Sequence, residues 1–128
     1  MDILLVDDHP VVHETLRAIV QSVRPGAEIH SQFDLDAALA QAKELDALGL
    51  VLLDLGLPGC FGTQALLRFR EEVPGVRVVI ISADDDEKSV RAAIALGAAG
   101  YLPKTMLPLD MAEALRVILD GATYRPRS

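Results

Sequence analysis

Residues 50–59 read Leu50-Val51-Leu52-Leu53-Asp54-Leu55-Gly56-Leu57-Pro58-Gly59, an apolar run that ends in a carboxylate and then breaks into turn residues. Such a run is typical of a strand buried on both faces, as in parallel sheets. In open α/β sheets, ligands bind just beyond the carboxyl ends of the strands. Asp54 therefore lies where such proteins perform chemistry, unless it only caps a turn, where Asp is also common.

Three further apolar runs are also followed by polar residues. Residues 3–6 precede Asp7 and Asp8, residues 76–81 precede Ser82, and residues 100–103 precede Lys104. If these runs are neighbouring parallel strands, their carboxyl ends meet at one edge of the sheet. The sequence thus predicts that three carboxylates, one hydroxyl and one ammonium group converge there.

Length and composition indicate one globular domain. The chain has 128 residues, of which 51% are hydrophobic and 24% charged, and its formal net charge is −7. A negative chain without a cluster of Lys and Arg is not expected to bind nucleic acid through its own surface. The single Cys60 excludes an internal disulfide, and no uncharged apolar run reaches the ~20 residues of a membrane span. We expect a cytoplasmic protein that does not enter a membrane.

The remaining apolar residues follow a helical spacing between the strands. This pattern predicts helices over residues 10–23, from Asp34 onward, over 63–72, over 86–96, and from 105–108 to 121, with a weak strand over 28–32. Five β-α units in succession predict an α/β fold with a single doubly wound parallel sheet of five strands. Residues 1–121 form the expected domain. Residues 122–128 show no partner pattern and are expected to be a linker.

The predicted cluster of charges suggests phosphoryl chemistry. Three carboxylates brought together repel one another, and Mg²⁺ suits a site with carboxylates, waters and a phosphate. With the metal bound, Asp54 can act as a nucleophile and form an aspartyl phosphate. Lys104 would neutralise the new charge, and Ser82 would donate a hydrogen bond to a phosphoryl oxygen.

Each of these residues also has a purely structural alternative. Asp7 and Asp8 suit the start of a helix, Ser82 suits a turn, Lys104 suits the solvated surface and Tyr101 suits core packing. The alternatives become less attractive because each residue follows a successive strand. The three histidines share no metal-ligand spacing and are expected at surface or packing positions: His9, His13 and His30.

Together, these residues resemble the receiver domain of two-component response regulators. The likeness rests on Asp7-Asp8, on Asp54 in its Leu-Asp-Leu-Gly-Leu-Pro-Gly setting, on Ser82-Ala83, and on Tyr101 with Lys104, and it extends over residues 3–121. It implies a flavodoxin-like fold with strand order 2-1-3-4-5. Residues 97–104 and 119–124 are most similar to receivers of the NarL/LuxR type, which usually precede a helix-turn-helix DNA-binding domain.

The resemblance implies a role for each acidic residue. Asp54 would be the phosphoacceptor, taking its phosphoryl group from a phosphohistidine of a sensor kinase or phosphotransfer protein. Asp8 and Asp54 would bind Mg²⁺ together with the backbone carbonyl of Gly56, and Asp7 would act partly through water.

The resemblance also implies a switch. Lys104 and Ser82 would contact the phosphoryl group, and Ser82 and Tyr101 would form the switch pair, with the aromatic ring turning inward. The surface formed by the last two helices and the strand between them would then change, and homodimerisation and transcriptional control would follow.

The sequence departs from the family pattern at four places. Thr105 rather than proline follows Lys104, so the family's cis peptide bond is not expected here. Phe61 stands where an Asp is frequent, which leaves the capping of the next helix in doubt. Gly56 places no side chain over the phosphoryl group, and Asp84 adds negative charge nearby. The lifetime of the phosphate is therefore open.

Two other functions are compatible with the same residues. The leading interpretation is a signalling module that is not an enzyme. A haloacid-dehalogenase-type phosphatase would also use Asp54 as nucleophile, but it needs an acid two residues later, where this chain has Gly56. The other alternative is a pseudo-receiver that keeps the fold and is never phosphorylated.

Overall fold

The computed structural model describes residues 1–60 and 63–126, in which strands and helices alternate strictly. The strands are β1 (Asp2–Val6), β2 (Glu28–Gln32), β3 (Leu48–Asp54), β4 (Arg77–Ser82) and β5 (Gly100–Pro103). The helices are α1 (Pro10–Val23), α2 (Leu35–Glu44), α3 (Gln64–Glu72), α4 (Glu87–Ala95) and α5 (Pro108–Leu119). The predicted series of five βα units is confirmed. No helix in the described part of the chain is long and apolar enough to cross a membrane.

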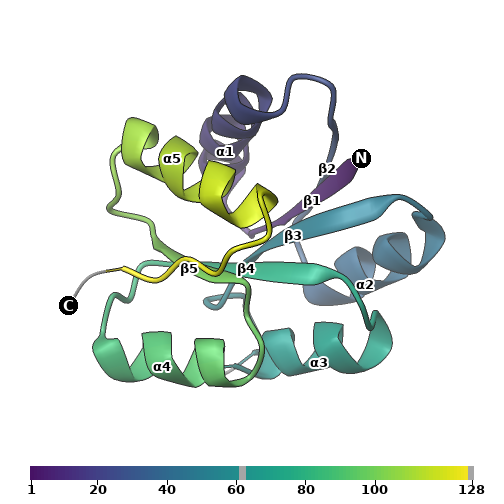
Figure 1. Cartoon of the computed structure of the whole chain (residues 1–128). Coiled ribbons are helices and arrows are strands. Elements are labelled where there is room, and N and C mark those ends of the chain that lie inside the picture. Colours follow the sequence, from purple (N-terminus) through teal and green to yellow (C-terminus); the bar gives the residue numbers. More distant parts are fainter. Residues whose placement is uncertain (61–62, 127–128) are drawn as a thin grey trace.

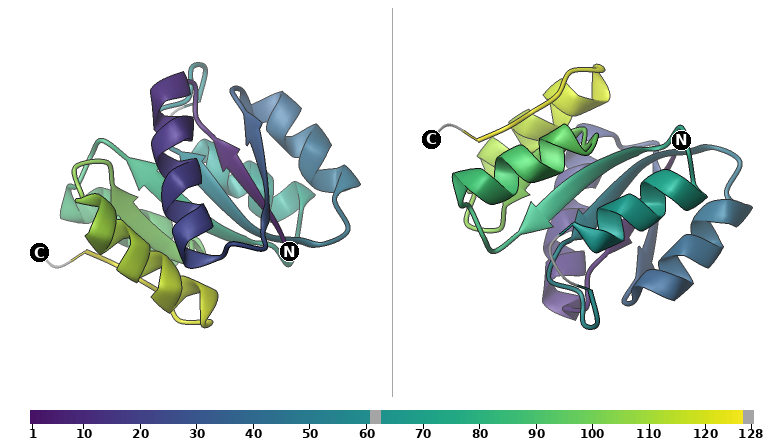
Figure 2. Two further views of the ribbon diagram at one scale, coloured as in Figure 1. Left: turned by 90° about the horizontal axis from the view of Figure 1, so that it is seen from above. Right: turned by 90° about the horizontal axis from the view of Figure 1, so that it is seen from below.

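The five strands form one parallel sheet in the order β2-β1-β3-β4-β5, as the resemblance implied. Helices α1 and α5 cover one face, and α2, α3 and α4 cover the other (Figures 1 and 2). The chain moves outward from β1 to β2 and then returns past β1 to β3. Right-handed crossovers in opposite directions place helices on opposite faces of the sheet.

The strands are apolar throughout because both of their faces are covered. In β1, Leu4 and Val6 pack in the core beneath α2, α3 and α4, whereas Ile3 and Leu5 pack in the core beneath α1 and α5. All four side chains are at most 1% exposed. Alternation places successive side chains on opposite faces, so a strand covered on both faces needs a continuous apolar run.

Local signals in the sequence fix several of the helix ends. Pro10 occupies the first turn of α1. A backbone N–H there has no partner within the helix, so proline, which lacks this N–H, gives up no hydrogen bond. The Asp34 carboxylate accepts a hydrogen bond from the Ala37 N–H at 2.8 Å and caps α2. Gly97, just after α4, has φ +98°, which a residue with a side chain rarely adopts. The last helix begins at Pro108, at the late end of the predicted range.

The segment after α5 is held against the sheet as far as Tyr124, although the sequence suggested no partner for it. The Tyr124 N–H donates to the Ala99 carbonyl at 3.2 Å, and the Tyr101 N–H donates to the Tyr124 carbonyl at 3.1 Å. Tyr124 thereby forms a parallel bridge with Gly100 on the edge strand β5. Arg77 also donates to the Ala122 carbonyl, at 2.7 Å. A single bridge has no periodic pattern, which is why the sequence did not reveal it.

Candidate functional site

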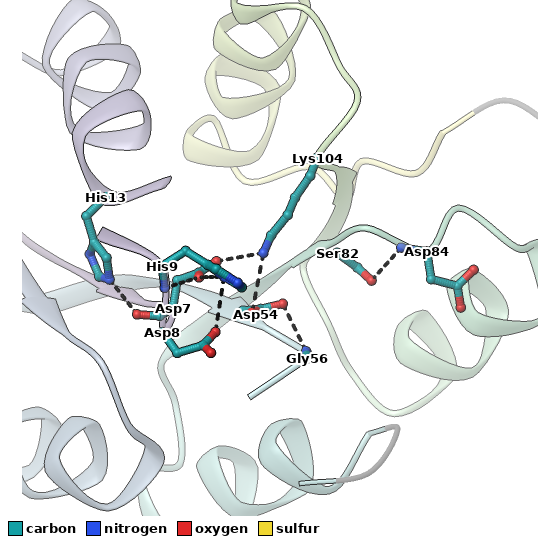
Figure 3. A network of polar contacts seen from close by, with 9 residues as sticks. All are labelled: Asp7, Asp8, His9, His13, Asp54, Gly56, Ser82, Asp84 and Lys104. Atoms are coloured by element: carbon teal, nitrogen blue, oxygen red, sulfur yellow. Dashed lines mark hydrogen bonds and ion pairs between the residues drawn. The ribbon is translucent and has the colours of Figure 1, made fainter. Parts of the chain in front are cut away.

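Three carboxylates meet at the carboxyl edge of the sheet, as the strand ends predicted (Figure 3). Asp54 is the last residue of β3, and Asp7 and Asp8 directly follow β1. Val6 pairs with Leu53 in the register of β1 and β3, which brings the two acidic strand ends side by side. The Asp7 and Asp54 side chains are 1% and 3% exposed, and Asp8 is 30% exposed. The site therefore buries two like charges almost completely.

The ammonium group of Lys104 lies near both of these buried acids. Its Nζ lies 2.9 Å from Asp7 Oδ2 and 3.4 Å from Asp54 Oδ2. The Lys104 N–H donates to the Ser82 carbonyl at 2.7 Å, so the loop after β5 is fixed to the end of β4. The predicted lysine is in place, but its shorter contact is with Asp7 and not with Asp54.

The two buried acids have opposite pKa shifts. Burial raises the pKa of Asp54, the Asp7 charge raises it further, and the Gly56 N–H and Lys104 lower it only partly. Burial also raises the pKa of Asp7, but hydrogen bonds from Lys104 and His9 outweigh it, so this pKa lies below its ordinary value. Burial lowers the pKa of Lys104, but its contacts with Asp7 and Asp54 leave it raised. Asp54 is thus the acid whose charge the site accommodates less well.

A single ammonium group, Lys104 Nζ, faces both Asp7 Oδ2 and Asp54 Oδ2, and among the described residues Asp54 Oδ2 accepts no hydrogen bond of good geometry. One lysine cannot neutralise three neighbouring carboxylates, so negative charge remains for a further cation to offset. Ligand atoms of the three acids lie within 4.8 Å of one another, and hard divalent cations prefer such oxygens. The residues therefore fit the Mg²⁺ that the resemblance implied.

Gly56 contacts the acceptor carboxylate through its backbone. Its N–H donates to Asp54 Oδ1 at 2.9 Å, which leaves Oδ2 as the free oxygen. A Cβ at position 56 would lie 3.4 Å from Asp54 Oδ1, so a side chain there would stand directly against the carboxylate. The expectation that Gly56 leaves the acceptor uncovered agrees with this geometry. Its carbonyl as a metal ligand stays a prediction.

The predicted switch residues belong to one hydrogen-bonded loop. Ser82 Oγ accepts from the Asp84 N–H at 3.0 Å, and the Tyr101 hydroxyl donates to the Asp84 carbonyl at 2.5 Å. The Tyr101 ring is fully buried, so the inward position expected after phosphorylation is already occupied. The Asp84 carboxylate accepts from the Asp86 N–H and from the Ser89 hydroxyl. Ser89 foremost lowers the pKa of Asp84, whose charge is thereby held in the loop.

Two histidines belong to the site, which the spacing argument did not foresee. His9 Nδ1 lies 2.9 Å from Asp7 Oδ1 and 3.1 Å from Asp8 Oδ1, with its ring 62% exposed. His13 is buried, as expected of a packing residue, and its Nε2 lies 2.6 Å from the Asp7 carbonyl oxygen. His9 is exposed, as predicted, but its contacts with the two acids were not predicted. Its position directly after two acids was the available signal.

The site opens to solvent through a cleft of about 360 Å³, lined among others by His9, Asp54, Ser82 and Lys104. Its walls are the ends of β3, β4 and β5 and the start of α4. Asp54 lines this cleft, although its side chain is only 3% exposed.

The departures from the family pattern have mixed outcomes. No cis peptide bond occurs within the described ranges, as Thr105 led us to expect. Thr63, at the start of α3, makes no side-chain capping bond, which agrees with the doubt about the capping of this helix. Phe61 lies outside the described residues.

Comparison with known proteins gives a consistent result. The family model described as "Response regulator receiver domain" matches residues 3–116. The chain is 40% identical over 124 residues to the glycerol metabolism activator of Pseudomonas putida, covering 97% of this chain and 56% of the relative. It is 34% identical over 119 residues to the nitrate/nitrite response regulator protein NarL of Escherichia coli K12, covering 93% and 55%. The chain thus spans about half the length of these relatives.

Solved structures show the same fold. A LuxR family DNA-binding response regulator from Silicibacter pomeroyi superposes with a TM-score of 0.86 at 27% identity, covering 99% of this chain and 98% of that one. A LuxR family two-component response regulator from Aurantimonas gives 0.84 at 31% identity, with 96% and 87% coverage. The likeness to the NarL/LuxR type is confirmed.

Proposed function

Because the chain belongs to the response regulator receiver domain family, we propose that it accepts a phosphoryl group on Asp54 in a Mg²⁺-dependent reaction. The donor is a phosphohistidine of a sensor kinase or phosphotransfer protein. The observation that carries the proposal is the free Oδ2 of buried Asp54, 3.4 Å from Lys104 and beside two further acids. Attack by a carboxylate oxygen on phosphorus is an established route to an aspartyl phosphate.

The residues that would hold Mg²⁺ are Asp8, Asp54 and the Gly56 carbonyl, with Asp7 acting partly through water. The bound ion supplies charge neutralisation and orients the phosphoryl oxygens. The carboxylate oxygens of Asp8 and Asp54, which lie within 4.8 Å of each other, support this assignment.

The transfer itself forms one bond and breaks another. Asp54 Oδ2 attacks phosphorus, the P–N bond of the phosphohistidine breaks, and its electron pair returns to the imidazole nitrogen. Gly56 keeps Asp54 Oδ1 fixed by its N–H, so Oδ2 is the attacking atom. Lys104 already lies within ion-pair distance of this oxygen and exchanges its contact with Asp7 for one with a phosphoryl oxygen.

Ser82 and Tyr101 transmit the effect of the new phosphoryl charge from the site to the surface of the domain. The Ser82 hydroxyl accepts from Asp84, so its own proton is available for a phosphoryl oxygen. Movement of Ser82 pulls on Asp84, whose carbonyl holds the Tyr101 hydroxyl. Since the ring is buried in this structure, the change is a locking of the inward position rather than an inward swing. This biases the surface of α4, β5 and α5.

The output is homodimerisation that controls transcription through a domain after residue 128, in the cytoplasm. Leu107 and Leu109, at the start of α5, are 67% and 85% exposed and offer apolar area to a partner. The matched relatives, about twice as long as this chain, include a protein described as a transcriptional activator. That activity is carried over only as part of this proposal.

Intact-mass analysis after incubation with acetyl phosphate and Mg²⁺ tests the transfer. The expected result is the gain of one phosphoryl group, lost in Asp54→Ala and in EDTA. Ser82→Ala is a matched control that keeps the acceptor. No gain with acetyl phosphate, and none with a phosphorylated kinase domain, would leave the pseudo-receiver as the better reading.

A further inference from the structure

His13 is a buried polar side chain that contacts the loop carrying two of the acids. It belongs to the first half of α1, is 5% exposed, and its Nε2 lies 2.6 Å from the carbonyl oxygen of Asp7. A carbonyl oxygen accepts hydrogen bonds and cannot donate them, so Nε2 is the donor. Figure 3 shows the ring pointing from α1 toward this carbonyl.

Packing alone does not explain a histidine at this position. The ring packs against that of Phe33, with the centroids 4.4 Å apart, a contact that an apolar side chain would also make. Its Nδ1 is buried and has no hydrogen-bond partner among the described residues. A buried polar atom without a partner destabilises the fold. The gain that offsets this loss is the hydrogen bond from Nε2 to Asp7.

This hydrogen bond completes the support of the Asp7 backbone. The Asp7 N–H donates to the Gln32 carbonyl at 3.2 Å, just beyond the last residue pair of β1 and β2. The Asp7 carbonyl is held by His13. Because a peptide bond is planar, fixing this carbonyl also fixes the N–H and the Cα of Asp8. His13 therefore sets the direction in which the Asp8 side chain leaves the backbone.

Asp8 depends on such support because its own side chain is weakly held. Its carboxylate is 30% exposed, and the ion-pair contact described for it is with His9 Nδ1 at 3.1 Å, on a ring that is 62% exposed. Its ligand atom nevertheless lies within 4.8 Å of that of Asp54, as a shared cation requires. Groups that hold metal ligands in place contribute strongly to metal affinity.

We propose that His13 is a positioning residue for the divalent ion. By holding the Asp7 carbonyl, it orients the Asp7–Asp8 peptide so that the Asp8 carboxylate faces Asp54 before Mg²⁺ binds. His13 itself does not touch the ion. The inference rests on the proposed function, because it concerns the ion that the phosphoryl transfer needs.

The test is a Mg²⁺ titration followed by the backbone amide resonances of ¹⁵N-labelled protein, which requires no phosphorylation. In His13→Leu, which lacks the donor, the Mg²⁺ dissociation constant should rise about tenfold. In phosphorylation by acetyl phosphate, the Mg²⁺ concentration for the half-maximal rate should rise by the same factor. The rate at saturating Mg²⁺ should stay at the wild-type level, since His13 acts on the binding of the ion and not on the transfer.

Two amide variants separate the hydrogen bond from packing. In His13→Gln, the amide nitrogen takes the place of Nε2, so wild-type affinity for Mg²⁺ should be restored. In His13→Asn, the shorter side chain reaches only as far as Nδ1, so binding should be as weak as in His13→Leu. This variant also serves if His13→Leu does not fold.

Val20→Ala is the control for a general loosening of α1. Val20 is 1% exposed and lies about two turns further along the helix, away from the loop after β1. This variant should be less stable but should bind Mg²⁺ as the wild type does.

Equal Mg²⁺ affinity of wild type and His13→Leu would overturn the inference. So would equally weak binding by His13→Gln and His13→Leu, or by Val20→Ala and His13→Leu. If Mg²⁺-dependent phosphorylation of wild-type Asp54 is observed in any of these cases, the proposed function still holds.

Discussion

Replacing Asp54 with Asn should stabilise the fold in the absence of divalent ions. The neighbouring charges repel the buried Asp54 carboxylate more strongly than they attract it, and the change removes that carboxylate. At an effective dielectric constant of 20, Lys104 at 3.4 Å attracts the Asp54 charge by about 5 kcal/mol. Asp7 and Asp8, with ligand atoms within 4.8 Å, each repel it by about 3.5 kcal/mol. The net repulsion is about 2 kcal/mol, before any desolvation, which acts in the same direction.

Asn keeps the shape and the oxygen that accepts the Gly56 N–H, so the gain is not offset by a lost hydrogen bond. For 128 residues, 1 kcal/mol corresponds to about 4 °C in melting temperature, so Asp54→Asn should melt about 8 °C higher in EDTA. The assay is thermal and urea unfolding followed by circular dichroism.

The pH dependence has a definite sign. Burial, and then the Asp7 charge, raise the pKa of Asp54 in the folded state above the ordinary 3.8. The wild type therefore loses stability, relative to Asp54→Asn, as pH rises through 3.8 and the carboxyl ionises. The advantage of the variant should be full at neutral pH and should vanish below 3.8, where the carboxyl is protonated in both states.

Asp84→Asn is the matched control, because the Asp84 carboxylate accepts hydrogen bonds from Asp86 and Ser89. This change should not raise the melting temperature. Saturating Mg²⁺ should close the gap between wild type and Asp54→Asn, since a ligand at 100 times its dissociation constant stabilises its binder by about 2.7 kcal/mol. A wild type at least as stable as Asp54→Asn in EDTA would refute the electrostatic argument.

Three further changes have expected outcomes. Lys104→Gln leaves buried Asp7 without its cation and should lower the free energy of unfolding by about 3 kcal/mol, measured in urea. Asp7→Asn should destabilise at neutral pH, and the difference should disappear in acid, because the folded pKa of Asp7 is lowered and its stabilisation is lost as pH falls. Gly100→Ala should cost about 1–3 kcal/mol, because the new Cβ would meet Ile118 Cδ1 at 2.7 Å and the Tyr124 carbonyl at 3.3 Å. If the urea midpoint of any of these three variants equals that of the wild type, the energetic role inferred for the contact that the variant removes or disturbs is wrong.

The fold and the acidic part of the site were predictable because strand burial leaves a strong signal. Apolar runs closed by Asp7, Asp54 and Ser82 defined both the parallel strands and the edge where they end. The topology then required these residues to meet, since parallel strands point their carboxyl ends the same way.

Features that depend on side-chain direction, on an isolated backbone pairing or on exact distances were not predictable. The contacts of His9 with Asp7 and Asp8 were not predicted, because spacing does not tell where a residue at a helix start points its ring. The fully buried ring of Tyr101 is a packing outcome, and the bridge of Tyr124 to β5 is a single backbone pairing without a pattern. The preference of Lys104 for Asp7 depends on distances that only the folded chain fixes.

The central claim is that Asp54 is the residue that carries the phosphoryl group. Borohydride reduces an aspartyl phosphate to homoserine, which tandem mass spectrometry of peptides locates at a single position. After incubation with acetyl phosphate and Mg²⁺, homoserine is expected at position 54 alone. Homoserine at position 7 or 8, or at none of the three, would contradict the claim.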